Sequence, residues 1–342
     1  MSILVIGDPH FKINNGKDTT IMMEKIIDLI KERKPDAVVL LGDVMHTHEQ
    51  AHIDPFIRAC DALVSMAELV ITYVLIGNHD LRNNTEYLSK KHFLAPLKYV
   101  PNLVIVDVPI KFSIREWNFI AVPYTPPGMF QNAIDTLELP TLDDISMIFA
   151  HQEFHGCKNG PKPSVIGDVW PDDNPLVVSG HIHDYCELKD NILYIGTPIK
   201  HNFGGEKLDK TVSWFTFGDE LKKERIGLGL PAKYKKIIMS EQIASYKPNV
   251  EPGVSLKVVI NCKLGEKAVI EKHPNVVLWK SLGYIVQCTV RRGTEEFVDL
   301  ADSIFDPDVN VRCKSFRESL YEDIAEDEDL VNAFNCTYSL NK

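Results

Sequence analysis

The sequence predicts an α/β fold in which two β-sheets form a sandwich flanked by helices, followed by a smaller C-terminal α+β domain. Three observations support this prediction. Short apolar segments end repeatedly in a glycine or a polar side chain, amphipathic helices separate the first of these segments, and several later segments follow one another without a helix. The 342 residues, 44% hydrophobic and 25% charged, suit a folded protein of about two domains.

The first half of the chain alternates expected strands with expected helices. Helices are expected over residues 20–33 and 55–69, where apolar side chains recur at helical spacing. The expected strands that end at a polar motif cover residues 3–6, 37–41, 71–76, 147–150 and 176–178. Residues 117–122, 192–195 and 211–217 have no helices between them, which predicts a second and more antiparallel sheet.

The composition changes near residue 230, where a glycine- and proline-punctuated stretch follows a charged one. The predicted domains are therefore residues 1–230, a small α+β domain over residues 231–317, and an acidic tail over residues 318–342. In the small domain, strands are expected over residues 254–262, 276–280 and 284–290, with helices over residues 266–271 and 294–303. The tail is expected to be solvated or to dock on a basic partner.

Charge, cysteine content and hydropathy exclude several classes of protein. The net charge of −11 argues against a nonspecific basic coat for nucleic acid. No apolar run approaches the ~18 residues of a membrane span, so no membrane association is expected. The seven cysteines form no CxxC pair, and the N-terminus lacks the pattern of a secretory signal. We expect a cytoplasmic protein, or one of the nucleus or a viral factory if its source is eukaryotic or viral, and not a secreted one.

Polar motifs follow five of the expected strands directly. They are Gly7-Asp8-Pro9-His10, Gly42-Asp43, Gly77-Asn78-His79-Asp80, His151 and Gly180-His181-Ile182-His183. Glycine allows the chain to turn sharply where the strand ends, and residues two apart project to the same side. The sequence therefore predicts that these side chains meet at one edge of the fold.

The side chains in these motifs are oxygen and nitrogen donors suited to metal ions. Seven candidate ligands are present: Asp8, His10, Asp43, Asn78, His151, His181 and His183. Seven donors exceed one tetrahedral site and suit two divalent ions that share a carboxylate. The lack of thiolate ligands disfavours a structural zinc site and leaves manganese, iron or zinc open.

In their order and form, these motifs resemble those of the calcineurin-like metallophosphoesterases over residues 1–217. The resemblance implies the metallophosphoesterase fold and assigns the ligands. Asp8, His10, Asp43 and His183 would hold the first metal, and Asp43, Asn78, His151 and His181 the second. It also implies that His79 lies beside the metals as a proton donor or as a group that stabilises the transition state.

Within this family, Gly42-Asp43-Val44-Met45-His46 resembles the GDxxH motif of the SbcD-type DNA-repair nucleases. The stretch from Tyr194 to Glu206 and the small domain after residue 230 are similar to the corresponding parts of those nucleases. The resemblance implies a DNA exo- or endonuclease with two manganese ions, in which His46 positions the scissile phosphate. Its expected partners are DNA, an SbcC-like coiled-coil ATPase and a second copy of the chain.

Two other functions stay open, and two are disfavoured. The chain could hydrolyse cyclic nucleotides, nucleotide sugars or phosphoproteins, or be an inactive scaffold of the same fold. The segment His151-Gln152-Glu153-Phe154-His155 lacks the glutamate that a zincin requires after its first histidine, and no P-loop is present. Residues 156–175 match no known motif. The remaining histidines are expected outside the site: His48, His52, His92, His155, His201 and His273.

Overall fold

The computed structural model describes residues 1–48, 50–158, 162–203, 209–230, 232–248, 254–263 and 265–290. The chain divides into two units, Met1–Thr294 and Glu295–Lys342. The predicted helix over residues 294–303, the acidic tail over residues 318–342 and residues 204–206 all lie outside the described residues. The predicted domain boundaries at residues 230 and 317 therefore stay a prediction.

The first sheet has six strands in the order β12-β11-β1-β2-β3-β4. Four neighbouring strands are parallel: β1 (Ser2–Ile6), β2 (Ala37–Leu40), β3 (Thr72–Leu75) and β4 (Leu103–Val106). On the other side of β1, β11 (Thr211–Thr216) pairs antiparallel with β1, and β12 (Lys222–Gly227) pairs antiparallel with β11. Alternate side chains of β1 point to opposite faces. Leu4 packs in the core under the helices, and Val5 packs in the core between the two sheets.

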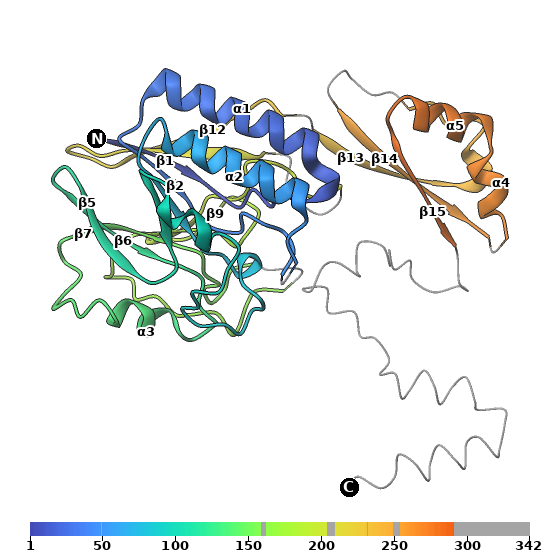
Figure 1. The fold of residues 1–342 in the computed structure, drawn as a ribbon. Coiled ribbons are helices and arrows are strands. Elements are labelled where there is room, and N and C mark those ends of the chain that lie inside the picture. The colour runs from blue at the N-terminus through green and yellow to red at the C-terminus, as the bar shows by residue number, and fades with distance from the viewer. Residues whose placement is uncertain are drawn as a thin grey trace, which may run out of the picture. The chain divides into compact units, whose positions relative to one another are not determined.

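Two helices, α1 (Gly16–Arg33) and α2 (Ile53–Ala67), cover the outer face of this sheet (Figure 1). Each presents an apolar face to the sheet: Met22 and Ile26 from α1 and Leu63 and Met66 from α2 are buried in the same core. The helices expected over residues 20–33 and 55–69 are thus confirmed, with ends shifted by a few residues.

The second sheet also has six strands, in the order β5-β6-β7-β8-β10-β9. Their bounds are β5 (Ile110–Ile114), β6 (Trp117–Val122), β7 (Ile145–Ala150), β8 (Val177–Ser179), β9 (Cys186–Lys189) and β10 (Ile192–Tyr194). Strands β6, β7, β8 and β10 are mutually parallel, and only the edge pairs are antiparallel.

Two details of the predicted second sheet are therefore wrong. It is mixed, because the connection from β6 to β7 carries a helix, α3 (Phe130–Asp135), and such a crossover permits parallel pairing. Thr211–Thr216 does not belong to it but pairs with β1 in the first sheet. Figure 1 shows α3 on the side of the second sheet away from α1 and α2, so the predicted two-sheet sandwich flanked by helices is confirmed.

A third sheet is wholly parallel and has three strands, β13 (Lys233–Met239), β14 (Ser255–Cys262) and β15 (Ile285–Val290). Its helices are α4 (Lys267–Glu271) and α5 (Pro274–Ser281). Residues 276–280, expected as a strand, lie in α5. Pro274 occupies the first turn, the backbone N–H of Asn275 donates to His273 Nδ1, and Val276 and Trp279 pack inward one turn apart.

Four 3₁₀ turns complete the described elements: η1 (Ile13–Asn15), η2 (Asn78–Asp80), η3 (Ala95–Tyr99) and η4 (Ser240–Gln242). Among the described residues, no helix has the length and apolar character needed to span a bilayer.

The ends of the two large sheets come into direct contact. A Cβ atom on Gly7, just after β1, would lie 1.8 Å from the carbonyl oxygen of Gly196, just after β10.

Gly7→Ala is expected to destabilise the protein, because the added methyl group would collide with backbone that cannot move without separating the sheets. We expect a loss of about 3 kcal/mol or more in the free energy of unfolding, measured by urea denaturation. Gly218→Ala is the matched control, since a Cβ there has nothing within 4 Å, and it should change stability by less than ~0.5 kcal/mol. Equal stability of the two variants would contradict the proposed contact between the sheet ends.

Candidate metal centre

Three of the predicted ligands lie in a backbone conformation that side chains other than glycine rarely adopt. The φ angles of His10, Asp43 and His181 are 44°, 48° and 76°. Hydrogen bonds between the strand ends hold these turns: the His10 N–H donates to the carbonyl of Asp43 over 3.0 Å, and the His181 N–H donates to Asp8 Oδ2 over 2.8 Å. Such strain is concentrated at functional sites, where the surrounding structure enforces it.

The first group of donors lies at the ends of β1, β2 and β8. His10 Nε2 is 3.1 Å from His183 Nε2 and 3.5 Å from Asp43 Oδ2. Ligand atoms of Asp8, His10 and His183 lie within 4.8 Å of one another. These are the residues predicted to hold the first metal, and the fold brings them together.

The second group of donors lies at the ends of β2, β3, β7 and β8. Asn78 Oδ1 is 3.0 Å from His151 Nε2 and 3.1 Å from His181 Nδ1, and Asp43 Oδ1 is 3.4 Å from His151 Nε2. His151 Nδ1 is 2.8 Å from the carbonyl oxygen of Leu41. A carbonyl only accepts, so Nδ1 carries a proton, and Nε2 faces this group. Burial lowers the pKa of His151, but Asp43 and Asp8 outweigh it and raise that pKa to about 9, so a metal ion held by Nε2 would displace a proton.

Asp43 belongs to both groups. Its Oδ2 faces His10 and its Oδ1 faces His151, while Oδ1 also accepts a 2.9 Å hydrogen bond from the backbone N–H of His79. The side chain of Asp43 is only 2% exposed, so its position is fixed by the groups around it. This is the arrangement that a carboxylate bridging two ions requires.

The electrostatics of the site also fit bound cations. Burial raises the pKa of Asp8 to about 8, with Asp43 and Asp80 adding to the rise and His151 opposing it. Burial would also raise the pKa of Asp43, but His151 and His79 outweigh it and lower that pKa. Burial lowers the pKa of His183 to about 3 and that of His10 well below its usual value. Neutral imidazoles can donate lone pairs to a metal, and divalent cations would offset the buried carboxylates.

The carboxylate of Asp8 shows whether the site suits a bound metal ion. Its Oδ1 is buried and has no hydrogen-bond partner among the described residues. His151 Nδ1 lies 3.5 Å from this oxygen but already donates to the carbonyl of Leu41. A buried carboxylate oxygen without a partner is unfavourable unless a cation contacts it. The donor set and this oxygen together fit two divalent metal ions.

Asp80 supports the centre without belonging to the predicted ligand set. It is buried, and its carboxylate accepts hydrogen bonds from the backbone N–H groups of Val44, Met45 and Gly77 at 3.3, 2.9 and 3.0 Å. Burial and Asp43 raise its pKa to about 7. These bonds tie the turn after β2 to the turn after β3, and thus fix Asp43 relative to Asn78. The sequence feature that could have identified Asp80 is its position as the last residue of the Gly77-Asn78-His79-Asp80 motif.

His46 and His79, predicted to act on the substrate, lie beside the first donor group. Their rings stack with centroids 5.5 Å apart, and His79 Nδ1 lies 2.7 Å from the carbonyl oxygen of His46. His46 Nδ1 is 3.3 Å from His10 Nδ1. Because ligand atoms of His10, His46 and His79 also lie within 4.8 Å of one another, they form a third candidate metal group. That His46 and His79 act on the substrate and do not bind a metal ion stays a prediction.

Two histidines that were expected outside the site lie at it. His201 is buried, its Nε2 is 2.9 Å from the carbonyl oxygen of Asp8, and its ring meets those of His10 and His183 edge-on at 4.8 and 5.3 Å. The ring of His48 stacks on His79 at 4.6 Å. Neither follows a strand directly, so the strand-end pattern could not identify them. Of the other excluded histidines, His92 packs against Asp107 and His273 caps α5.

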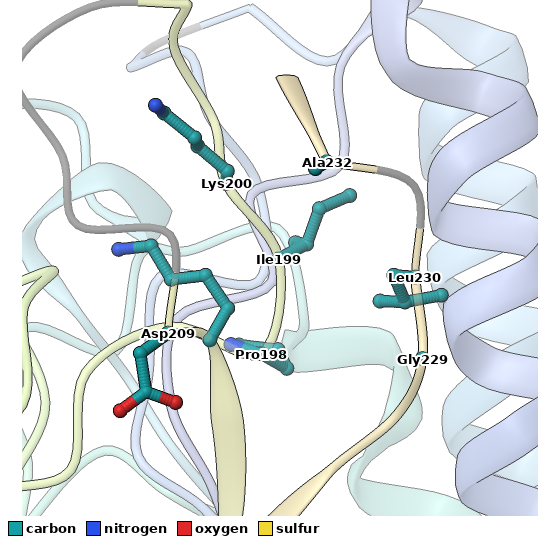
Figure 2. Close-up of a pocket in the computed structure, with 8 residues that line it drawn as sticks. Pro198, Ile199, Lys200, Asp209, Gly229, Leu230 and Ala232 are labelled. Atoms are coloured by element: carbon teal, nitrogen blue, oxygen red, sulfur yellow. The ribbon is translucent and has the colours of Figure 1, made fainter. Parts of the chain in front are cut away.

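A small pocket of about 190 Å³ lies next to the segment that carries His201. Figure 2 shows Ile199 and Leu230 approaching it from two different parts of the chain, with Lys200 and Asp209 nearby. None of the seven predicted ligands lines it. The pocket is therefore separate from the donor groups at the strand ends.

A model of the calcineurin-like phosphoesterase family matches residues 1–185. The chain is 35% identical over 340 residues to a protein of invertebrate iridescent virus 3 named phosphoesterase 078R, covering 92% of this chain and 96% of that protein. It is 39% identical over 217 residues to a protein of invertebrate iridescent virus 6 named phosphoesterase 244L, covering 64% and 76%. A dimetal phosphatase from Danio rerio has a TM-score of 0.41 at 13% identity, covering 67% of this chain and 96% of that structure. The family match includes all five strand-end motifs.

Metal content distinguishes ligands from neighbouring side chains. Asp43→Asn should lower the manganese bound per chain, because it weakens the one carboxylate that faces both groups. His79→Ala should keep the wild-type manganese content, because its Nδ1 is engaged with His46 and the two donor groups are complete without it. Both are measured by elemental analysis after dialysis against manganese. Loss of metal from His79→Ala would instead place His79 among the ligands.

Proposed function

Because this chain belongs to the calcineurin-like phosphoesterase family, we propose that it is a two-metal phosphodiesterase whose substrate is DNA. That it is a metal-dependent phosphoesterase follows from the family and from its donor groups. The observation that carries the two-metal proposal is Asp43, whose two carboxylate oxygens face the two groups of donors.

Asp8, His10 and His183 would hold one ion, Asn78, His151 and His181 the other, and Asp43 both. Bound there, the ions would supply Lewis acidity and positive charge to the phosphoryl group. The chain contributes a rigid frame, since six of the seven ligands are at most 13% exposed and directed by strand ends. Manganese is our proposed metal, because the motifs resemble those of the SbcD-type nucleases; the nitrogen and oxygen donors are compatible with manganese, iron or zinc.

We propose that His79 assists the leaving oxygen. Donation from its Nδ1 to the carbonyl of His46 fixes the ring and leaves Nε2 as the atom that can carry a proton. Burial lowers the pKa of His79, although Asp43 opposes this effect. An anionic phosphodiester beside the ring would favour the protonated form. We therefore assign His79 the role of proton donor or of stabilising the transition state.

His46 supports the choice of DNA as substrate. It occupies the last position of the Gly42 to His46 motif that resembles the SbcD-type nucleases. In the structure, its ring stacks on His79 and meets that of His10 edge-on, so it borders the space in front of the donor groups. A side chain there can contact a phosphate next to the one that reacts. This supports a role for His46 in orienting a long substrate.

The remaining features of this proposal rest on the sequence resemblance alone. An SbcC-like coiled-coil ATPase would supply the energy-dependent step, and the nuclease chain would be a homodimer. We propose that the complex acts in DNA repair or recombination in the cytoplasm, or in the nucleus or viral factory of a eukaryotic host.

The test compares two substrates in manganese, linear duplex DNA and bis(p-nitrophenyl) phosphate. The wild-type protein should hydrolyse both. His79→Ala should slow both by a factor of ~10² to 10⁴, because it removes a proton donor or a group that stabilises the transition state. His46→Ala should reduce cleavage of DNA more than hydrolysis of the small diester, which can rotate freely into line.

His52→Ala is the matched control, since His52 is exposed and makes no side-chain cap on α2. It should match the wild type on both substrates. Hydrolysis of the small diester without any cleavage of DNA would contradict the nuclease proposal. If His46→Ala lowered the rate of hydrolysis equally for the two substrates, the proposed role of His46 in orienting DNA would be contradicted.

A further inference from the structure

We propose that His201 is a positioning residue for the first metal ion, because it holds Asp8, His10 and His183 in place from outside the donor group. This inference rests on the proposed function, since it requires that the two donor groups bind two ions. It goes beyond that function by giving one of the two ions a support that the other does not share.

The ring of His201 donates a hydrogen bond to the backbone of a candidate ligand. His201 Nε2 lies 2.9 Å from the carbonyl oxygen of Asp8, and a carbonyl only accepts, so Nε2 carries the proton. The side chain of Asp8 is held as well, because the backbone N–H of His181 donates to its Oδ2 over 2.8 Å. With its carbonyl and Oδ2 both bonded, Asp8 directs its buried Oδ1 toward the place of an ion.

The same ring packs against both histidines of the first donor group. The ring centroids of His201 and His10 are 4.8 Å apart at an interplanar angle of 86°, and those of His201 and His183 are 5.3 Å apart at 65°. A ring packed edge-on against a neighbour in a close-packed interior cannot rotate without a collision. His201 therefore limits the rotation of the two imidazoles whose Nε2 atoms lie 3.1 Å apart.

His201 is itself held firmly. It is 6% exposed and ends a short stretch, residues 196–201, that follows β10. Within this stretch the Thr197 N–H donates to the carbonyl of His183 over 3.1 Å, and Ile199 is buried in the core under α1 and α2. The stretch thus joins the turn after β8 to the turn after β1, and it fixes the position from which His201 acts.

The second donor group has supports of its own. His151 Nδ1 donates to the carbonyl of Leu41, and Asp80 ties the turn after β2 to the turn after β3. Hydrogen bonds that orient ligands from outside typically change metal affinity 10- to 100-fold when they are lost. Loss of His201 should therefore weaken the first ion selectively. A histidine that only fills space would instead lower stability without changing the affinity for one of two ions.

The test measures manganese binding to the full-length protein by equilibrium dialysis and elemental analysis over a range of manganese concentrations. The wild-type chain should bind two ions. His201→Phe keeps a ring but loses the N–H donor, so one of the two ions should bind ~10 to 100 times more weakly while the other keeps its affinity. His201→Gln returns an N–H close to the position of Nε2 and should recover most of the lost affinity.

A second variant without the hydrogen bond guards against a packing defect that is peculiar to phenylalanine. In His201→Asn the amide is too short to reach the carbonyl of Asp8, so the same ion should be weakened as in His201→Phe. His273→Phe is the matched control, since it removes a histidine that caps α5 and contacts Asn275. It should lower the melting temperature slightly and leave both manganese affinities unchanged.

Three outcomes would overturn the role of His201. They are wild-type affinity for both ions in His201→Phe and His201→Asn, an equal loss of both ions in these variants, and a loss in His201→Gln as large as that in His201→Phe. Each would leave the two-metal proposal intact as long as the wild-type chain binds two ions. A wild-type chain that binds only one manganese ion would contradict the two-metal proposal itself, and the role of His201 with it.

Discussion

The buried carboxylate of Asp43 is the group on which the organisation of this molecule depends. One of its oxygens faces a histidine from β1 and the other a histidine from β7, so it joins donors from both sheets. The first sheet supplies Asp8, His10, Asp43 and Asn78, and the second supplies His151, His181 and His183. The metal centre therefore exists only if the two sheets pack with these strand ends together. The contact between Gly7 and Gly196 shows how little space separates them.

Placing so many polar groups in a buried site is unfavourable, and the surrounding structure offsets the cost. Asp80 accepts three backbone N–H groups, and His181 donates its own N–H to Asp8, so the turns are fixed before any ion binds. The left-handed turns at His10, Asp43 and His181 store strain that the well-packed cores on both sides of the first sheet sustain. Stability from the cores thus supports a centre that is itself unfavourable.

Much of this could be predicted from sequence, because the candidate ligands follow strands whose apolar pattern is plain, and glycine begins four of the five motifs. The meeting of the seven candidate donors, the two-sheet sandwich and both helices of the first sheet could be predicted in this way. Other features depend on contacts between residues far apart in sequence. His201 joins His10 only through folding, α3 is too short for a clear helical pattern, and α5 is rich in valine and leucine, which suggested a strand. Glu153 belongs to no recognised motif, so its closeness to His181 became visible only in three dimensions.

The most direct test of the central claim is a crystal structure of the protein soaked in manganese, with the ions located by their anomalous scattering. The account predicts two peaks about 3.5 to 4 Å apart, both in contact with Asp43 and one of them in contact with the buried Oδ1 of Asp8. A single peak, or two peaks of which only one contacts Asp43, would contradict the shared carboxylate.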